Sequence, residues 1–402
     1  MTGMKQTFDV IIIGGGVTGL TTAIHLKLHG VERVIILERH HIGAGQSHRA
    51  AGIIRGLVRD LSLSRALVES VGFFKTFEDR FSVPLSLNSA GYLLLSESAQ
   101  TAIVDEVVAV AAQAGSQSQR IDAHQAQELQ PGLREDDESL YVFEPGAIQL
   151  DPMPAVQALL AVARQMGVTI LEGAEVLKLV VQGDRFIGVE TSQGHHDAPQ
   201  VLVATSVWGA DQLRQLGIDV PVYPHRAEMA FFHAPWASDF RLERILTDAR
   251  SMLYLRPEGD KQMFVGWREG DRIRSVKDMV AENPDDYKQT TRFESLSDMH
   301  RRLAITLPPM ANGFVHRTYA CVYDYTPDGV PILDQVAGLE GVYFALGFSG
   351  GGFSISPWVG RCMAQFMADG KVPTELERFD LKRFAEERAF TWANVQTQKD
   401  DG

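Results

Sequence analysis

Residues 14–19, with the sequence GGGVTG, constrain the fold more than any other stretch of the chain. The residues before them, 8–13, form a short apolar run that predicts a buried strand, and residues 17–28 have the apolar spacing of a helix. Residues 34–37 predict a second buried strand. A strand, a helix and a strand in this order indicate a right-handed βαβ unit with parallel strands.

The glycine spacing is typical of a turn that binds a dinucleotide. Glycines there permit a tight turn, a close approach of the backbone to a pyrophosphate, and close packing of the helix on the strand. The start of the helix also offers N–H groups and a positive dipole end. Glu38, at the end of the second strand, can accept hydrogen bonds from ribose hydroxyls. We therefore predict an ADP-binding set of Gly14, Gly16, Val17, Thr18, Gly19, Glu38 and Arg39.

The segment after the second strand favours FAD over NAD. Residues 43–52, GAGQSHRAAG, are mostly small and let the chain run close to a flat ring system. A flexible surface loop is the alternative, but the apolar Ile53 and Ile54 that follow argue for burial. The residues predicted to contact the cofactor here are Gly45, Gln46, Ser47, His48, Arg49, Ala50, Ala51 and Gly52.

Later segments predict a second type of structure. Residues 151–166 predict a helix with Asp151 as its cap, and residues 168–171, 176–181, 186–191 and 200–204 predict strands. Short strands at 229–233, 252–256 and 263–267 precede a polar helical stretch that we expect to cover a cofactor. We predict an α/β fold with a discontinuous Rossmann-like, glutathione-reductase-type FAD-binding domain (1–88, 146–219 and 318–402). An antiparallel β-sheet substrate domain with helices (89–145 and 220–317) completes it.

Composition excludes some classes of function. A formal net charge of −13 argues against a sequence-independent grip on nucleic acid, which needs a basic surface. The two cysteines, Cys321 and Cys362, form no disulfide framework, and no metal site is predicted. No apolar run is long enough for a membrane span, and no secretory signal is visible, so we expect a cytoplasmic protein.

Several stretches together resemble the D-amino-acid-oxidase-type family of FAD-dependent amine and amino-acid oxidoreductases, among them glycine oxidase, sarcosine oxidase and proline dehydrogenase beta subunits. They are the glycine motif, GAGQSHRAAGIIR, GAIQLDP at 146–152, VLVATSVW at 201–208, and TPDGVPILD through GFSGGGF at 326–353. The resemblance implies FAD, and oxidation of the C–N bond of an amino acid or N-alkyl amino acid. Hydride passes to flavin N5, and the imine product then hydrolyses. Substrate choice varies within the family.

The glycine-rich residues 347–353 follow a predicted strand and precede a predicted helix at 356–367, with Ser356 as N-cap and Pro357 at its first position. In the family this loop lies by the pyrimidine end of the flavin, whereas a mobile linker is the alternative. The cofactor set implied by the resemblance is completed by Gly347, Gly350, Gly351, Gly352, Phe353, Ser354, Val176, Thr205 and Trp208.

Four residues match positions of the family's substrate site. Arg55 matches an arginine that grips the substrate carboxylate, a role that suits a guanidinium fork, with a structural ion pair as an equally weighted alternative. Tyr254, Arg268 and Tyr323 match positions of the family's active site, although for each of them taken alone a structural role is the favoured interpretation.

Cys321 matches the cysteine that carries covalent FAD in some relatives, and simple packing of a buried thiol is the alternative. His48 lies one place early for a histidyl link of the kind found in other relatives. The family's substrate-binding lysine and its oxygen-activating lysine fall at Ser354 and Phe264 here, which puts a simple sarcosine oxidase in doubt.

Three alternatives to an amino-acid oxidoreductase therefore stay open. They are a 2-hydroxy-acid oxidoreductase, a dehydrogenase subunit that passes electrons to a partner, and a flavin-binding module without turnover. The expected partners are a small amine or amino-acid substrate and either oxygen or another electron acceptor. The oligomeric state, whether homo-oligomer or subunit of a complex, is left open.

Overall fold

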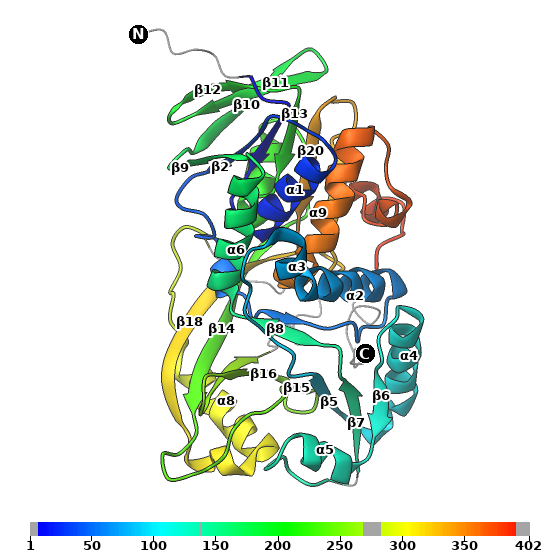
Figure 1. The fold of residues 1–402 in the computed structure, drawn as a ribbon, viewed down its shortest axis with the longest axis vertical. Coiled ribbons are helices and arrows are strands. Elements are labelled where there is room, and N and C mark those ends of the chain that lie inside the picture. The colour runs from blue at the N-terminus through cyan, green and yellow to red at the C-terminus, as the bar shows by residue number, and fades with distance from the viewer. Residues whose placement is uncertain (1–6, 137, 268–282, 391–402) are drawn as a thin grey trace.

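The computed structural model describes residues 7–136, 138–267 and 283–390. Figure 1 shows two packed halves, with a parallel sheet and its helices in the upper half and a large, mainly antiparallel sheet in the lower half. This arrangement confirms the predicted fold class. The division of the chain into domains at the stated boundaries stays a prediction.

The upper half is built on a six-stranded sheet with the order β19-β20-β13-β1-β2-β9. All of these strands run parallel except β19, which pairs antiparallel with β20. The strands are β1 (Val10–Ile13), β2 (Val34–Glu38), β9 (Thr169–Glu172), β13 (Gln200–Val203), β19 (Ile332–Gln335) and β20 (Val342–Leu346).

Side chains of β1 alternate between two separate hydrophobic cores. Val10 and Ile12 pack among the helices α1 (Val17–Leu28), α6 (Pro152–Gln165) and α9 (Gly352–Asp369). Ile11 and Ile13 pack on the opposite face, where α7 (Gly209–Arg214) and an antiparallel sheet of β10 (Val176–Gln182), β11 (Arg185–Thr191) and β12 (Gly194–Asp197) lie. A strand covered on both faces must be apolar throughout, which explains the unbroken apolar run of β1.

The lower half is an eight-stranded sheet with the order β18-β14-β17-β16-β15-β5-β7-β6. Its strands pair antiparallel except β15 with β5. They are β5 (Tyr92–Glu97), β6 (Gln119–Ile121), β7 (Ser139–Glu144), β14 (Tyr223–His233), β15 (Ile245–Asp248), β16 (Leu253–Glu258), β17 (Gln262–Trp267) and β18 (Phe314–Tyr325).

Helices cover both faces of this sheet. On one face, α8 (Phe293–Thr306) and α5 (Ala123–Leu129) share a core with Leu93, Leu95 and Leu255. On the other, α4 (Thr101–Gln113) packs on Tyr92 and Leu94. The polar helix predicted to cover a cofactor, α8, thus buries its apolar side against the sheet.

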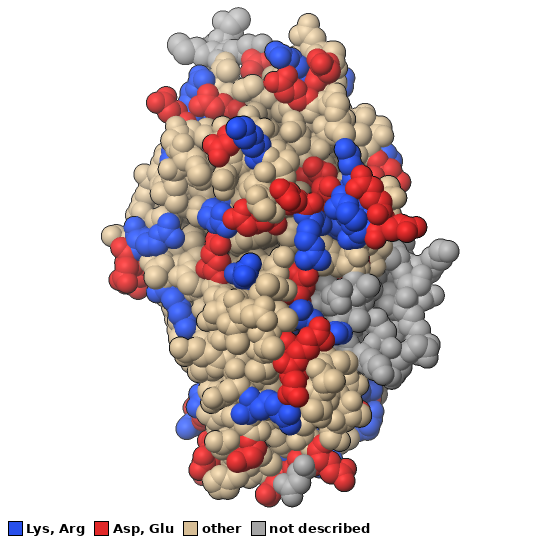
Figure 2. All heavy atoms as spheres, turned by 90° about the vertical axis from the view of Figure 1, so that its right-hand side faces the viewer, with Lys and Arg blue, Asp and Glu red and all other residues tan. Residues whose placement is uncertain are grey.

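A small sheet, β3-β8-β4, joins the two halves (Figure 1). It consists of β3 (Ile53–Ile54), β4 (Leu87–Asn88) and β8 (Ile148–Leu150), and α2 (Leu61–Lys75) and α3 (Phe77–Phe81) lie beside it. Among the described residues, no helix combines the length and the apolar character that crossing a bilayer requires. Figure 2 shows Lys and Arg interspersed with Asp and Glu on one face, so that face carries mixed charge.

Candidate functional site

Two adjoining cavities lie where the two halves meet. The larger, of about 420 Å³, lies at the carboxyl ends of β1, β2 and β13, and the smaller encloses about 300 Å³. Tyr323, Phe348 and Gly350 line both cavities. The carboxyl edge of a parallel sheet is where doubly wound folds bind ligands. The two cavities therefore form a single candidate site with two compartments.

The glycine turn has the tight geometry that the motif predicts. Gly14 has φ +110°, and a Cβ there would lie 2.4 Å from the carbonyl oxygen of Ala204. At Gly19 a Cβ would lie 2.0 Å from the carbonyl oxygen of Gly14, so only glycine lets α1 pack this closely on the turn. The backbone N–H of Val17 donates to Ser47 Oγ at 3.0 Å, which joins residues 46–49 to the start of α1.

Glu38 is held at the rim of the larger cavity by the turn itself. Its Oε2 accepts a hydrogen bond from Gly15 N at 2.9 Å, and its Oε1 accepts one from His40 N at 2.9 Å. These bonds fix the carboxylate beside the glycine turn, in the position that suits a ribose.

Most of the predicted cofactor residues line the larger cavity. They are Gly14, Gly16, Val17, Thr18, Glu38, Arg39, Gly45, Gln46, Ser47, Arg49, Ala50, Val176, Thr205, Trp208, Gly350, Gly352 and Phe353. Ala51, Gly351 and Ser354 line the smaller cavity instead. Gly19, His48, Gly52, Cys321 and Gly347 are absent from the lining of both. The structure thus brings segments from four distant parts of the chain around one cavity, and each residue's contact with FAD stays a prediction.

His48 and Cys321, the two candidates for a covalent link, lie outside both linings. The ring nitrogen Nδ1 of His48 lies 2.9 Å from the carbonyl oxygen of Gly43, and burial lowers the pKa of the imidazole. Cys321 is fully buried among Met229, Phe231 and Phe264, and this burial raises the pKa of its thiol to about 12. Its surroundings are those of a packed apolar side chain.

The predicted start of α9 is wrong. The helix begins at Gly352 after Gly351 as N-cap, so Ser356 lies inside it and Pro357 is an interior proline. Proline cannot donate to the carbonyl of Phe353 one turn earlier, and the hydroxyl of Ser356 donates to that carbonyl at 3.1 Å instead. The helix therefore starts directly at the cavity wall, with Gly352 and Phe353 in the lining.

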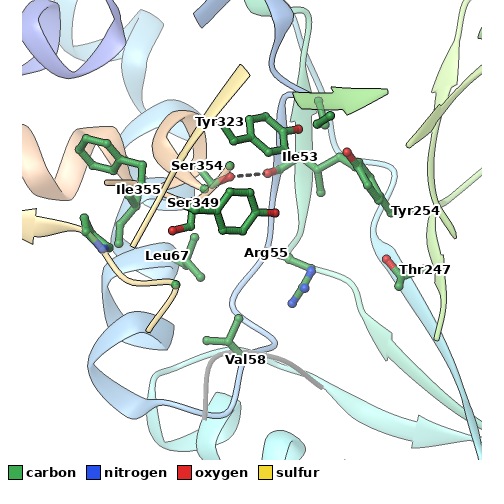
Figure 3. Close-up of a pocket in the computed structure, with 18 of the residues that line it drawn as sticks. Ile53, Arg55, Val58, Leu67, Thr247, Tyr254, Tyr323, Ser349, Ser354 and Ile355 are labelled. Carbon is green, nitrogen blue, oxygen red and sulfur yellow. Dashed lines mark hydrogen bonds between the residues drawn. The ribbon is translucent and has the colours of Figure 1, made fainter. Parts of the chain in front are cut away.

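The smaller cavity contains three of the four predicted substrate residues. Arg55, Tyr254 and Tyr323 line it, and Arg268 lies outside the described residues. Figure 3 shows the Arg55 side chain between Leu67 and Val58 on one side and Thr247 and Tyr254 on the other. The guanidinium carbon of Arg55 lies 4.7 Å from the ring centroid of Tyr92, and the guanidinium donates to the carbonyl of Leu57. Ser354 Oγ donates to the carbonyl of Ile53 at 2.9 Å (Figure 3).

The backbone that carries Arg55 rests on a buried carboxylate. Glu144, at the end of β7, is 3% exposed and accepts hydrogen bonds from Gly56 N at 2.7 Å and Leu57 N at 3.1 Å. Burial raises the pKa of Glu144, and the hydrogen bonds and the nearby Arg55 partly oppose this. Glu144 thus fixes the backbone that follows Arg55 beside the smaller cavity.

Sequence reasoning missed a second group of lining residues. Pro284, Asp285, Tyr287 and Gln289 line the larger cavity together with Asp211, Gln212 and Asp324. Tyr92, Thr247 and Trp267 line the smaller one. These residues belong to no glycine motif, and their distance in the sequence hides their proximity. A carboxylate near the end of a long strand, as at Asp324 in β18, is a signal too weak to use alone.

The lining of the larger cavity fits FAD. Two of its side-chain atoms, Gln46 Oε1 and Tyr287 Oη, are buried without a hydrogen-bond partner among the described residues. Buried polar atoms are normally paired, so these atoms indicate a bound polar group. The glycine turn and the start of α1 suit a diphosphate, and Glu38 suits a ribose. Among the described residues, no cluster of His, Cys, Asp and Glu suitable for a metal ion is present.

Comparison with known proteins agrees with this geometry. The family model DAO, described as FAD dependent oxidoreductase, matches residues 9–366. Over 93% of its length, the chain is 24% identical to 4-methylaminobutanoate oxidase (formaldehyde-forming) from Paenarthrobacter nicotinovorans, of which the match covers 45%. Monomeric sarcosine oxidase from Bacillus sp. is 23% identical, with 95% of this chain and 98% of that protein covered.

The solved structures show the same fold. L-proline dehydrogenase from P. horikoshii superposes with a TM-score of 0.85 at 24% identity, over 96% of this chain and 99% of that one. The chain spans about half the length of the first curated relatives it matches, but nearly the whole of monomeric sarcosine oxidase. With the glycine turn, the cavity pair and a family match over most of its length, the chain belongs to the DAO family of FAD-dependent oxidoreductases.

Proposed function

We propose that the chain oxidises the C–N bond of an amino acid or N-alkyl amino acid that binds in the smaller cavity. In this proposal FAD occupies the larger cavity, and its ring lies by the residues that line both compartments, Tyr323, Phe348 and Gly350. One observation carries the proposal. The guanidinium of Arg55 lines a cavity that opens onto the cofactor cavity, whereas the other arginine of that lining, Arg226, is paired with Glu228 at 2.6 Å.

Arg55 supplies the charge that a substrate carboxylate needs. Its guanidinium is positioned by the Tyr92 ring and by the carbonyl of Leu57. The buried acid Glu144 directs its oxygens at the backbone N–H groups of Gly56 and Leu57. A planar guanidinium fork matches a carboxylate with two parallel hydrogen bonds, and this fixes the orientation of the substrate.

Apolar side chains of the smaller cavity suit the apolar part of a substrate. Val58, Leu63, Leu67 and Ile355 line the cavity and exclude water from the reacting carbon. FAD, when bound, supplies the acceptor for the hydride that leaves the carbon beside the nitrogen. The residues of the chain then bind and orient the substrate rather than carry out the acid–base chemistry.

Tyr323, which lines the smaller cavity, and Tyr319, near it in β18, stay neutral. Burial raises the pKa of Tyr323 well above its ordinary value, and that of Tyr319 likewise. A neutral phenol donates and accepts hydrogen bonds but does not serve as a base near neutral pH. We therefore propose that Tyr323, with Tyr254 beside it, orients the substrate nitrogen.

A panel of substrates tests this function. The FAD-loaded protein is mixed anaerobically with amino acids, N-methyl amino acids and 2-hydroxy acids, and loss of the yellow flavin absorbance is followed. Bleaching by an amine substrate supports the proposal. Bleaching by 2-hydroxy acids alone would replace it with an alcohol oxidoreductase, and no bleaching with any member would leave a flavin-binding module. Oxygen consumption with the active substrate then separates an oxidase from a dehydrogenase that uses another acceptor.

A further inference from the structure

Residues 284–289, here named the covering segment, reach the larger cavity from an unexpected part of the chain. They precede α8 of the lower half, yet Pro284, Asp285, Tyr287 and Gln289 line the cavity formed by the glycine turn of the upper half. The segment therefore closes the candidate FAD site with residues that no dinucleotide motif contains.

Asp285 fastens the covering segment to two other walls of the cavity. Its Oδ1 accepts from Arg39 Nη2 at 2.7 Å and from Trp208 Nε1 at 3.0 Å. Arg39 directly follows β2, and Trp208 lies just after β13. The guanidinium carbon of Arg39 lies 4.4 Å from the ring centroid of Trp208, so these two side chains already contact each other. One carboxylate thus joins three segments around the cavity.

The other end of the covering segment is held by arginines. Arg226 of β14 donates from Nε to the carbonyl of Lys288 at 2.8 Å and from Nη2 to the carbonyl of Thr290 at 2.5 Å. Arg49 Nη2 donates to Gln289 Oε1 at 3.2 Å. With Asp285 fixed at one end and these bonds at the other, Tyr287 between them has a defined position.

Tyr287 lines the larger cavity. Its hydroxyl is buried and has no hydrogen-bond partner among the described residues. Burial raises the pKa of Tyr287, so the phenol stays a neutral donor. A buried hydroxyl without a partner is costly, which indicates that a ligand completes its hydrogen bonding.

We propose that the covering segment is part of the FAD site and slows the release of the cofactor, with Asp285 fixing the segment and Tyr287 donating a hydrogen bond to FAD. The inference rests on the proposed placement of FAD in the larger cavity. It predicts that affinity for FAD depends on residues that the glycine motif and its neighbours do not include.

Release of FAD tests the inference without any turnover. The FAD-loaded full chain is diluted, and the rise of free-flavin fluorescence gives the dissociation rate, while titration of the apoprotein with FAD gives Kd. We expect Asp285→Ala and Tyr287→Phe each to release FAD about tenfold faster and to raise Kd similarly, since each loses one or two hydrogen bonds. Asp285→Asn keeps the shape and an acceptor oxygen but not the ion pair. Its rate of FAD release is expected to lie between that of the wild type and that of Asp285→Ala.

Asp286→Ala is the matched control, because it removes the same charge one residue further along at a position outside the cavity lining. It is expected to release FAD like the wild type. Equal release rates in the wild type, Asp285→Ala and Tyr287→Phe would overturn the inference while leaving the cofactor site intact. A wild-type chain that takes up no FAD would overturn both.

Discussion

The carboxylate of Glu144 accepts a hydrogen bond from the backbone N–H of Gly56 at 2.7 Å, directly behind the arginine of the smaller cavity. A second bond, from Leu57 N at 3.1 Å, completes the contact. An acid at the end of β7 thus fixes the residue next to Arg55, although the two parts of the chain are far apart in sequence. The position of the guanidinium depends on this support as well as on its own contacts.

Replacing Arg55 by methionine removes the proposed carboxylate contact. We expect the KM of a carboxylate substrate to rise about ten- to a hundredfold, because a hydrogen bond to a charged group contributes about 1.5–3 kcal/mol. Steady-state kinetics on Arg55→Met measure this. Arg59→Met is the control, since Arg59 pairs with Glu106 and lies outside both cavity linings. An unchanged KM in Arg55→Met would take Arg55 out of the substrate site.

Glu144→Gln tests the support behind Arg55. An amide places an N–H group against one of the two backbone donors, so one hydrogen bond is lost and the segment at residues 56–57 shifts. We expect a loss of about 1–3 kcal/mol in the free energy of unfolding. We also expect a several-fold rise in KM with kcat nearly unchanged, since Glu144 does not touch the reacting atoms. Urea unfolding and kinetics test both, and a fall in kcat at constant KM would contradict the positioning role.

Asp324 predicts a defined pH dependence of stability. Burial raises its pKa to about 6, partly opposed by hydrogen bonds from Phe348 N, Gly347 N and Ser206. The folded chain then binds more protons than the unfolded chain between the ordinary pKa of 3.8 and about 6. Protonation of Asp324 therefore stabilises the folded chain. This stabilisation is complete below that pH window and is lost as pH rises through it, which lowers the free energy of unfolding by about 3 kcal/mol.

Asp324→Asn removes this titration. The difference in unfolding free energy between the apoproteins of wild type and Asp324→Asn is therefore expected to change between pH 4 and pH 7, in favour of the variant at the higher pH. Chemical unfolding at several pH values measures it. A difference that stays constant with pH would show that Asp324 titrates normally.

Cys321 is expected to leave the flavin unattached. Its thiol is fully buried, has a pKa raised to about 12, and lies outside the lining of both cavities, so it is held as a neutral packed side chain. Acid precipitation of the FAD-loaded protein should release all flavin to the supernatant. Yellow colour retained in the wild-type pellet and absent from that of Cys321→Ala would instead establish a covalent link.

Of two glycine-to-alanine changes, one is expected to abolish FAD binding and the other to stabilise the chain. A Cβ at Gly19 would lie 2.0 Å from the carbonyl oxygen of Gly14, so Gly19→Ala should displace α1 and abolish FAD binding. Gly72 lies inside α2, and a Cβ added there would meet nothing within 4 Å, so Gly72→Ala should stabilise the chain by about 0.5–1 kcal/mol. Thermal unfolding and FAD titration compare the two, and normal FAD binding by Gly19→Ala would contradict the packing argument.

The prediction of α1 rested on local sequence patterns. The helix spans Val17–Leu28 as predicted, because its apolar spacing, the glycines before it and Gly30 after it all agree. For α9, the same kind of local pattern predicted the wrong starting residue. Ser356 and Pro357 look like the first residues of a helix, but the helix extends back to Gly352, where the carbonyl of Phe353 accepts from the hydroxyl of Ser356.

By itself, the sequence determined the βαβ unit and the dinucleotide turn with Glu38, because short-range spacing encodes both. Its resemblance to the D-amino-acid-oxidase-type family indicated the cofactor and the fold family. Only the tertiary structure decided that Glu144 supports the backbone next to Arg55, that Cys321 lies outside the lining of both cavities, and that Asp285 and Tyr287 line the larger cavity. These contacts join residues far apart in the chain through packing and burial, which no local pattern records.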